Sequence, residues 1–440
     1  MESYSIIIIL LAVAIGLFPI AEKFKIPYPV LLLLTGIGVG FIPGFEGITI
    51  SPEVVFLIFL PPMLYDAAFN IPIKEFRSNL NTISLLAISL VFVTTTGIAT
   101  VVHFLIPEMS WPLAFVLGAI LSPPDAIAAS GVTKGLNIPH RTGAILEGES
   151  LVNDASALVA FRFAVAAVAG VEFILWKAAL QFVISLGGGI FVGWIMWALF
   201  ALVNKRFRLS SQVIVGLNIL IPFVAYLIAE EFHVSGVIAV VTAGLIIAQH
   251  KNKWPKETLS QNKSVWDTAI FILGGLIFIL IGLEFPQVLR EIPTERILPF
   301  IGCAFLIFVV ALLIRMIVLF WHKNNTERKY RRFVGMQSER SKRSPVQDKR
   351  HKQRMKFIKD FEPLKTKDCI LLGWSGMRGI VSLAAALSLP LIMDDGSDFP
   401  ERASIIFLTV VTVIIMLLIQ GAGLPVLVKL LKIDEAEIEK

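Results

Sequence analysis

The four residues Ser122-Pro123-Pro124-Asp125 interrupt an otherwise apolar stretch, residues 112–131. As a helix that rises 1.5 Å per residue, a stretch of this length spans the roughly 30 Å hydrocarbon core of a bilayer. The interruption lies about ten residues from each end, near the middle of such a membrane. Two consecutive prolines remove two backbone donors and clash with the preceding helical turn. We therefore expect a membrane helix that unwinds at mid-depth.

A second apolar stretch, residues 367–390, is interrupted in the same way by Gly373-Trp374-Ser375-Gly376-Met377-Arg378-Gly379. If the chain consists of two six-helix halves joined by a seventh helix, each interrupted helix is the fifth member of its half. Interruptions at corresponding positions of two halves are typical of transporters built from inverted repeats, whose site lies where the broken helices cross. The pattern therefore predicts crossed, discontinuous fifth and twelfth helices.

The composition agrees with a membrane protein, since 56% of the 440 residues are apolar and only 16% are charged. Soluble domains carry about a quarter charged residues, so an ordinary soluble globule is excluded. We expect an all-α polytopic protein of about thirteen transmembrane helices. The expected helices are residues 4–20, 28–42, 53–69, 80–106, 112–131, 142–170, 176–203, 211–230, 234–249, 264–285, 297–321, 367–390 and 402–428.

The distribution of positive charge predicts the orientation, because short loops rich in Lys and Arg remain cytoplasmic. The segment from His322 to Lys367 has 16 Lys and Arg residues against 5 Asp and Glu residues. An odd number of helices then places the N-terminus outside and the C-terminus in the cytoplasm. We expect the membrane to be the plasma membrane, the inner membrane of a bacterial cell, with its lipids around the chain. The expected organisation is helices one to eleven in residues 1–321, a basic cytoplasmic loop in 322–366, the last two helices in 367–430 and a short tail in 431–440.

Two uses of the basic loop are open. It is either a solvated linker that only sets the topology, or a regulatory or lipid-binding arm.

The sixth expected helix contains acidic residues at membrane depth, where ionisable groups are costly and usually functional. Asp154 lies about twelve residues from the cytoplasmic end, and Ser150 lies about 40° from it on the same helical face. Glu149 lies about 140° away from Asp154, so the two carboxylates cannot both face one small site. We expect Asp154 to face a cavity with Ser150. Glu149 then needs a buried cation, for which Arg315 is the first candidate and Arg378 the second, and the resulting pair is either purely structural or part of the site.

Asp125 and Arg378 lie at the two interruptions, where the ends of half-helices have opposed partial charges that these side chains could neutralise. Arg162 is the third arginine that we expect to be buried. Asp66 and Glu284 lie near helix ends and are expected at an entrance or boundary. Asp154 has a neutral neighbour, Asn153, and no cation on its own helical face, so it is expected to bind a proton readily.

Other chemistry has little support in the sequence. The two cysteines, Cys303 and Cys369, form no CxxC pair, and no His/Cys cluster indicates a zinc site. No HExxH or GxxxxGK[ST] motif is present, so proteolysis and ATP-driven pumping are not indicated. We therefore expect no enzyme, no cofactor and no nucleic-acid partner.

Four sequence motifs resemble those of the monovalent cation:proton antiporters of the NhaP/NHE sodium/proton exchanger family. The resemblance is carried by Leu60–Ala68 in the third helix, Gly118–Ala126 in the fifth, Leu146–Ala155 in the sixth and Trp374–Leu383 in the twelfth, and it continues with Arg315. It implies a homodimer with an interface domain and a moving core domain. It also implies Asp154 as ion ligand and proton carrier assisted by Ser150 and Glu149, with Glu149 paired to Arg315.

One motif departs from the family pattern. Many members have Thr-Asp-Pro where this chain has Pro124-Asp125-Ala126, so a hydroxyl at position 124 is missing. Backbone carbonyls of the unwound stretch, or Ser122, could replace it. The expected side-chain set around the cation is Asp154, Ser150, Glu149, Asn153, Ser122 and Asp125.

The sequence therefore predicts sodium/proton exchange by alternating access at Asp154, with protons and sodium competing for one carboxylate. Family members that move net charge have an acid immediately before this aspartate, whereas this chain has Asn153. We accordingly expect electroneutral one-for-one exchange. Potassium/proton exchange is the alternative, and a gated cation channel or a membrane sensor is a further one.

Overall fold

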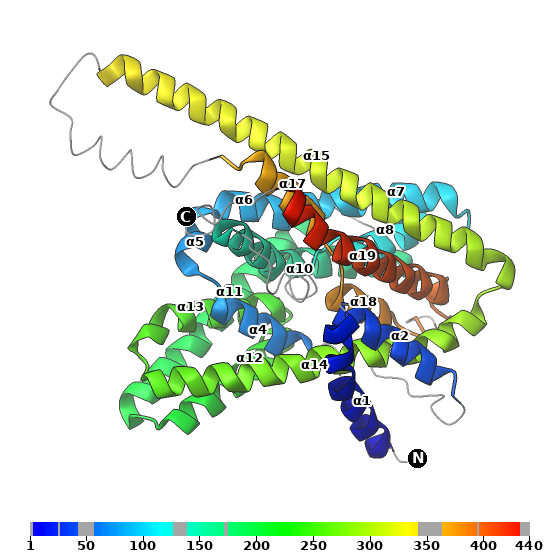
Figure 1. Cartoon of the computed structure of the whole chain (residues 1–440), viewed down its shortest axis with the longest axis horizontal. Coiled ribbons are helices and arrows are strands. Elements are labelled where there is room, and N and C mark those ends of the chain that lie inside the picture. Colours follow the sequence, from blue (N-terminus) through cyan, green and yellow to red (C-terminus); the bar gives the residue numbers. More distant parts are fainter. Residues whose placement is uncertain are drawn as a thin grey trace.

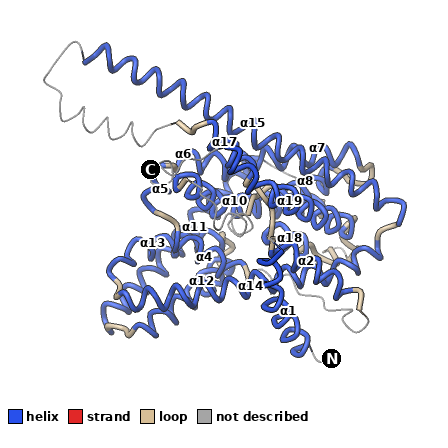
Figure 2. Tube along the Cα trace, viewed as in Figure 1, coloured by secondary structure: helices blue, strands red, loops and turns tan. Residues whose placement is uncertain are grey.

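The structure is a computed structural model that describes residues 3–24, 27–42, 57–125, 139–170, 175–341, 363–393 and 396–431. Within these ranges the chain forms helices and no strands (Figure 2), which confirms the all-α prediction. The helices are α1 (Ser3–Phe24), α2 (Tyr28–Gly40), α4 (Leu60–Asn70), α5 (Ile73–Ser78), α6 (Leu80–Ser84), η1 (Leu85–Leu90), α7 (Val91–Leu105), α8 (Trp111–Leu121), α10 (His140–Val168), α11 (Leu175–Phe207), α12 (Ser211–Glu231), α13 (Gly236–His250), η2 (Lys251–Lys253), α14 (Lys256–Glu291), α15 (Thr294–Ser341), α17 (Thr366–Trp374), α18 (Ile380–Leu387) and α19 (Arg402–Leu431).

Seven helices of the described chain are long and apolar enough to cross a membrane, and two shorter helices are also apolar. The seven are Leu80–Leu105, His140–Val168, Leu180–Phe207, Ser211–Glu231, Lys256–Glu291, Thr294–Arg332 and Arg402–Leu431, and the shorter ones are Tyr28–Gly40 and Trp111–Leu121. The chain is thus a multi-pass membrane protein. The total of thirteen crossings and their arrangement as inverted repeats stay predictions.

The two predicted interruptions are present. Helix α8 ends at Leu121 and residues 122–125 are not helical, while the rest of the expected fifth helix, 126–131, lies outside the described residues. The expected twelfth helix consists of α17 and α18, separated by residues 375–379. Residues 53–56 of the expected third helix also lie outside the described ranges.

The fourth expected helix contains a feature that the apolar pattern did not predict. Residues Leu85–Leu90 between α6 and α7 form a π-helical turn. Such turns occur mostly as single insertions within α-helices and leave no signature in hydropathy.

The helices form two groups that lie side by side (Figure 1). We call α1, α2, α4 and α11–α14 the panel, and α6–α8, α10, α15 and α17–α19 the core bundle. In the panel, α2 packs directly on α14, because a Cβ atom at Gly36 would collide with the Ile279 carbonyl oxygen. Helix α14 also borders the core bundle, where Phe285 stacks on Phe407 of α19 with ring centroids 5.6 Å apart.

Polar contacts distinguish the two ends of the core bundle. At one end, Arg141 donates to Asn79 at 2.9 Å and Lys323 donates to Thr366 at 2.8 Å. At the other end, Arg296 pairs with Glu108 at 2.7 Å and lies 3.8 Å from Glu401. We refer to these as the basic end and the acidic end.

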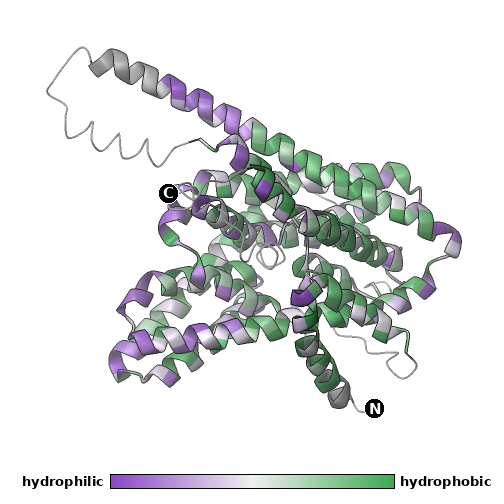
Figure 3. Cartoon of the chain, viewed as in Figure 1, coloured by the Kyte–Doolittle hydropathy of each residue, from purple (hydrophilic) through white to green (hydrophobic). Residues whose placement is uncertain are grey.

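Helix α15 is longer than expected, with 48 residues ending at Ser341. The hydrophilic turns that follow its apolar first half project beyond the bundle (Figure 3). Residues 322–341 are therefore helical, whereas we expected all of 322–366 to be a loop. Lys, Arg and Glu are good helix formers, and the Glu327–Arg331 pair, 2.5 Å apart at i,i+4, adds to their effect.

Candidate functional site

Asp154 lies near the middle of the 29-residue helix α10 and its residue is only 2% exposed. Its Oδ1 atom is buried and has no hydrogen-bond partner within the described residues. A buried carboxyl group without a partner is costly unless it binds a proton or a cation. Asp154 is therefore the position in α10 where an exchangeable positive charge would be stabilised.

Asn153 connects α10 to the interruption of the fifth helix. Its Nδ2 atom donates a hydrogen bond to the Pro124 carbonyl oxygen at 2.9 Å. The amide oxygen of Asn153 is buried and lacks a partner within the described residues. The unwound residues after α8 are thus held next to Asp154 by a side chain that was expected near the cation but not as the link between these two segments.

The two interrupted helices meet at their interruptions. The Asp125 carboxylate accepts a hydrogen bond from the Ile380 backbone N–H at 2.8 Å, and the Asp125 N–H donates to the Met377 carbonyl at 2.7 Å. Asp125 therefore places negative charge at the N-terminus of α18, where the helix dipole is positive.

Arg378 makes the reciprocal contact. Its Nε donates to the Leu121 carbonyl, the last residue of α8, at 2.7 Å, and its Nη1 donates to the Gly376 carbonyl at 3.2 Å. The guanidinium therefore lies at the negative C-terminal end of α8. Asp125 and Arg378 thus lie at the two half-helix ends whose partial charges they were expected to neutralise.

Glu149 and Arg315 form a buried pair, the first of the two pairings considered for Glu149. Arg315 Nη1 and Nη2 donate to the two carboxylate oxygens of Glu149 at 2.5 and 2.7 Å, and the side chains are 3% and 0% exposed. Arg315 Nε also donates to the Leu372 carbonyl in α17 at 2.9 Å. Gly376 allows this approach, since a Cβ atom there would lie 2.6 Å from Arg315 Cδ. The pair thus joins α10, α15 and α17.

Two serines, Ser122 and Ser150, were also expected in the site. Ser122 is buried, and its hydroxyl donates to the Ala119 carbonyl at 3.1 Å, so it closes the end of α8. Ser150 is partly buried one turn before Asp154. Their expected roles as cation ligands stay predictions.

Arg162 is not buried, contrary to expectation. Its side chain is 57% exposed and pairs with Glu230 at 2.8 Å. It lies in the last turns of α10, where the helix end meets α12 and a long side chain can reach the surface.

Charged residues interact at the basic end, and among them only Asp66 was named from the sequence. Asp66 of α4 interacts electrostatically with Asp267 of α14 and Lys251 of η2, and Glu147 of α10 interacts with Asp66. Glu147 lies seven residues, or about two turns, before Asp154 and therefore on nearly the same face of the helix. This spacing was a signal in the sequence for Glu147. Lys251 donates to the Phe69 carbonyl at 2.8 Å, and burial lowers the pKa of its ammonium while Asp66 partly offsets that effect. Asp66 thus lies where α4 of the panel faces α10 of the core bundle, and its expected role at an entrance stays a prediction.

Comparison with known proteins identifies related sequences along nearly the whole chain. Residues 7–430 match the family described as "Sodium/hydrogen exchanger, transmembrane". The "Sodium, potassium, lithium and rubidium/H(+) antiporter" of Bacillus pumilus is 33% identical over 438 residues, which cover 97% of this chain and 61% of that protein. This chain therefore spans less than two thirds of the length of that relative. The "Na(+)/H(+) antiporter NhaH" of Halobacillus dabanensis is 30% identical, with 96% of each chain covered.

A solved structure has the same fold. The sodium proton antiporter MjNhaP1 from Methanocaldococcus jannaschii superposes with a TM-score of 0.70 at 19% identity, covering 98% of this chain and 99% of that one.

Proposed function

The chain belongs to the sodium/hydrogen exchanger family, and on that premise we propose that it exchanges sodium for protons at Asp154. The observation that carries the proposal is the burial of Asp154 in the middle of α10, where the residue is 2% exposed and its Oδ1 has no partner within the described residues. Such a group has a site for one positive charge. Sodium and a proton would therefore compete for the same oxygen atoms.

The unwound residues after α8 supply further oxygen atoms for a hard cation. Asn153 holds the Pro124 carbonyl near Asp154 through its 2.9 Å hydrogen bond, and a carbonyl oxygen has a second lone pair for a ligand. Unwound backbone carbonyls coordinate alkali cations in other transporters with broken helices. Ser150, Glu149, Ser122 and Asp125 complete the proposed surroundings of the ion.

Exchange follows if the empty carboxylate cannot cross the membrane while either loaded form can. The core bundle carries Asp154 and both interrupted helices, and it would move against the panel to expose the site on alternate sides. The Glu149–Arg315 pair supports an electroneutral cycle, because a carboxylate held by two hydrogen bonds at 2.5 and 2.7 Å is poorly suited to exchange protons. Asn153 has no proton to exchange, so one sodium would replace one proton.

We further propose that the chain lies in the plasma membrane with its basic end in the cytoplasm, which places the N-terminus outside and the C-terminus inside. The projecting, basic second half of α15 supports this orientation. The homodimer implied by the family resemblance is also part of the proposal, and size-exclusion chromatography with light scattering tests it.

Potassium/proton exchange is the second candidate. The Bacillus pumilus relative is named for sodium, potassium, lithium and rubidium, and position 124 of this chain has no hydroxyl to fix the size of the site. A site with few side-chain ligands would discriminate weakly between alkali cations.

The test is cation-induced fluorescence dequenching in everted membrane vesicles that contain the chain. After a proton gradient is formed, sodium, lithium and potassium are added separately, and vesicles without the chain serve as the control. Dequenching by sodium supports the proposal, and dequenching by potassium alone supports the second candidate. Cation flux that needs no opposing proton gradient would instead indicate a channel.

A further inference from the structure

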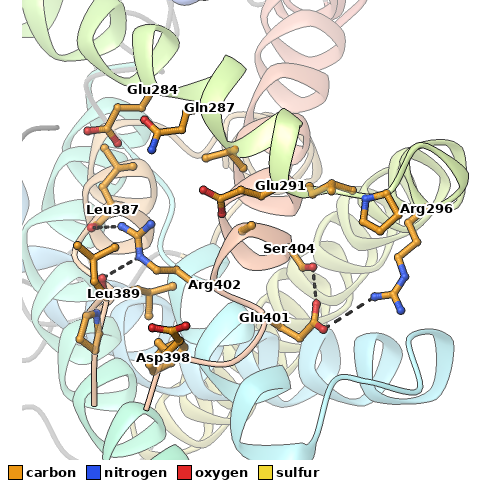
Figure 4. A pocket seen from close by; sticks show the side chains of 17 residues that line it. Glu284, Gln287, Glu291, Arg296, Leu387, Leu389, Asp398, Glu401, Arg402 and Ser404 are labelled. Carbon is orange, nitrogen blue, oxygen red and sulfur yellow. Dashed lines mark hydrogen bonds and ion pairs between the residues drawn. The ribbon is translucent and has the colours of Figure 1, made fainter. Parts of the chain in front are cut away.

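A cavity of about 880 Å³ lies at the acidic end between the panel and the core bundle (Figure 4). Glu284 and Glu291 of α14 line it from the panel, and Leu387, Leu389 and Arg402 line it from the core bundle. The two glutamates are seven residues apart and so lie on nearly the same face of α14. In the proposed orientation this cavity opens to the outside.

Arg402, the first residue of α19, is bound to the end of the broken helix α18. Its Nε donates to the Leu389 carbonyl at 3.1 Å and its Nη2 donates to the Leu387 carbonyl at 3.4 Å. A positive charge is favourable at the C-terminal end of a helix. Since Asp125 binds the first N–H of α18, this eight-residue helix has a charged side chain at each end, one beside the proposed ion site and one in the outer cavity.

The same guanidinium lines one cavity with Glu284 and Glu291 of α14, whose negative charges favour its ionised form. Arg402 therefore connects the outer end of α18 to the panel. An interaction across the boundary between two bodies changes in strength when one moves against the other, and it then favours the state in which the charges are closer.

We propose that Arg402 is a positioning residue for exchange, which attracts the outer end of α18 toward Glu284 and Glu291 and thereby favours the state with a narrowed outer cavity. This inference rests on the proposed function and orientation. It assigns no contact with the cation to Arg402. Its consequence is a bias between the inward-facing and outward-facing states.

Neutralising Arg402 should therefore favour the outward-facing state. A shift between the two states changes the apparent affinities for sodium at the two sides of the membrane in opposite directions, because sodium on each side binds only the state that is open to that side. For Arg402→Gln we expect the apparent KM for external sodium to fall and that for cytoplasmic sodium to rise, each about twofold to fivefold, the range of partly exposed ion pairs.

Arg296 provides a matched control in the same cavity. It pairs with Glu108 at 2.7 Å and lies 3.8 Å from Glu401, and both of these lie on the core bundle side. Arg296→Gln removes the same charge from the cavity, but the ion pairs it breaks are those with Glu108 and Glu401. It should change the two KM values equally or leave them unchanged.

The experiment measures sodium-dependent proton movement in right-side-out and everted vesicles for wild type, Arg402→Gln, Arg402→Lys, Glu291→Gln and Arg296→Gln. Opposite KM shifts in Arg402→Gln and Glu291→Gln, with recovery toward wild type in Arg402→Lys, support the proposal. Glu291→Gln leaves the cap on α18 intact, so it tests the attraction even if Arg402→Gln does not fold.

Equal shifts at both faces in Glu291→Gln, or the same opposite shifts in Arg296→Gln, would overturn the proposal while the proposed function stands. If the wild-type chain exchanges no alkali cation for protons, the proposed function fails and this inference fails with it.

Discussion

The buried pair between Glu149 and Arg315 predicts a large and non-additive loss of stability. Arg315 donates two hydrogen bonds to Glu149 at 2.5 and 2.7 Å in surroundings where the side chains are 3% and 0% exposed. Removing one member strands the charge of the other, which costs about 3 to 5 kcal/mol in buried pairs. We expect losses of this size for Glu149→Gln and for Arg315→Leu.

The double variant should lose far less than the sum of these losses, because it leaves no buried charge unpaired. The difference should be at least about 2 kcal/mol, as is typical of residues in direct contact. Melting of the purified variants in detergent measures it. Arg162→Gln is the control, since the Arg162–Glu230 pair has a similar distance of 2.8 Å but Arg162 is 57% exposed, so its loss should stay below about 1 kcal/mol. Additive losses in the double variant would refute the direct buried pair.

Three further predictions concern the crossing, the panel and the stoichiometry. Asp125→Ala should destabilise the protein by about 0.5 to 2 kcal/mol, because the first N–H of α18 loses its charged acceptor. Asp125→Asn should lose less stability. Thermal melting measures both losses, and wild-type melting of both variants would contradict this role of Asp125. Gly36→Ala should lower the yield of folded protein, since its Cβ would collide with the Ile279 carbonyl. Gly38→Ala is the control and should not lower the yield, because the space around Gly38 is open. Equal yields of the two variants in size-exclusion chromatography would contradict the packing of α2 on α14. Exchange in proteoliposomes should reach the same endpoint at any valinomycin-imposed potential, because one-for-one exchange moves no net charge. Each net charge moved would contribute about 2.3 kcal/mol per 100 mV. A shifted endpoint would show that a second group carries protons, with Glu149 as first suspect.

Much of the fold could be read from the sequence because the membrane imposes length and apolarity on each helix. The two interruptions were visible for the same reason, since Pro123 and Pro124 and the glycines around Arg378 oppose a continuous helix. Helical periodicity and the cost of an unpaired buried charge showed that Glu149 needs a cation, but they left Arg315 and Arg378 as candidates, and the family resemblance implied Arg315.

Other features depend on the lateral order and register of the helices, which hydropathy does not encode. The hydrogen bond from Asn153 to the Pro124 carbonyl requires α10 to lie beside the end of α8 at one register. Arg402 begins α19, and nothing in the sequence around it differs from that at other helix starts. Only the fold brings it to the end of α18. Arg162 was misplaced although the end of α10 was predicted to within two residues, because hydropathy does not show that this face of the helix meets Glu230 at the surface.

The central claim is that Asp154 is the shared site for sodium and protons. The most direct measurement is sodium-driven proton movement in proteoliposomes that contain purified wild type, Asp154→Asn or Glu327→Gln, a control at a charged residue on the projecting part of α15. The variants are first compared with wild type by size-exclusion chromatography. We predict that Asp154→Asn remains folded but moves no protons in response to sodium, while Glu327→Gln behaves as wild type. Sodium-driven proton movement at the wild-type rate in Asp154→Asn would contradict the account.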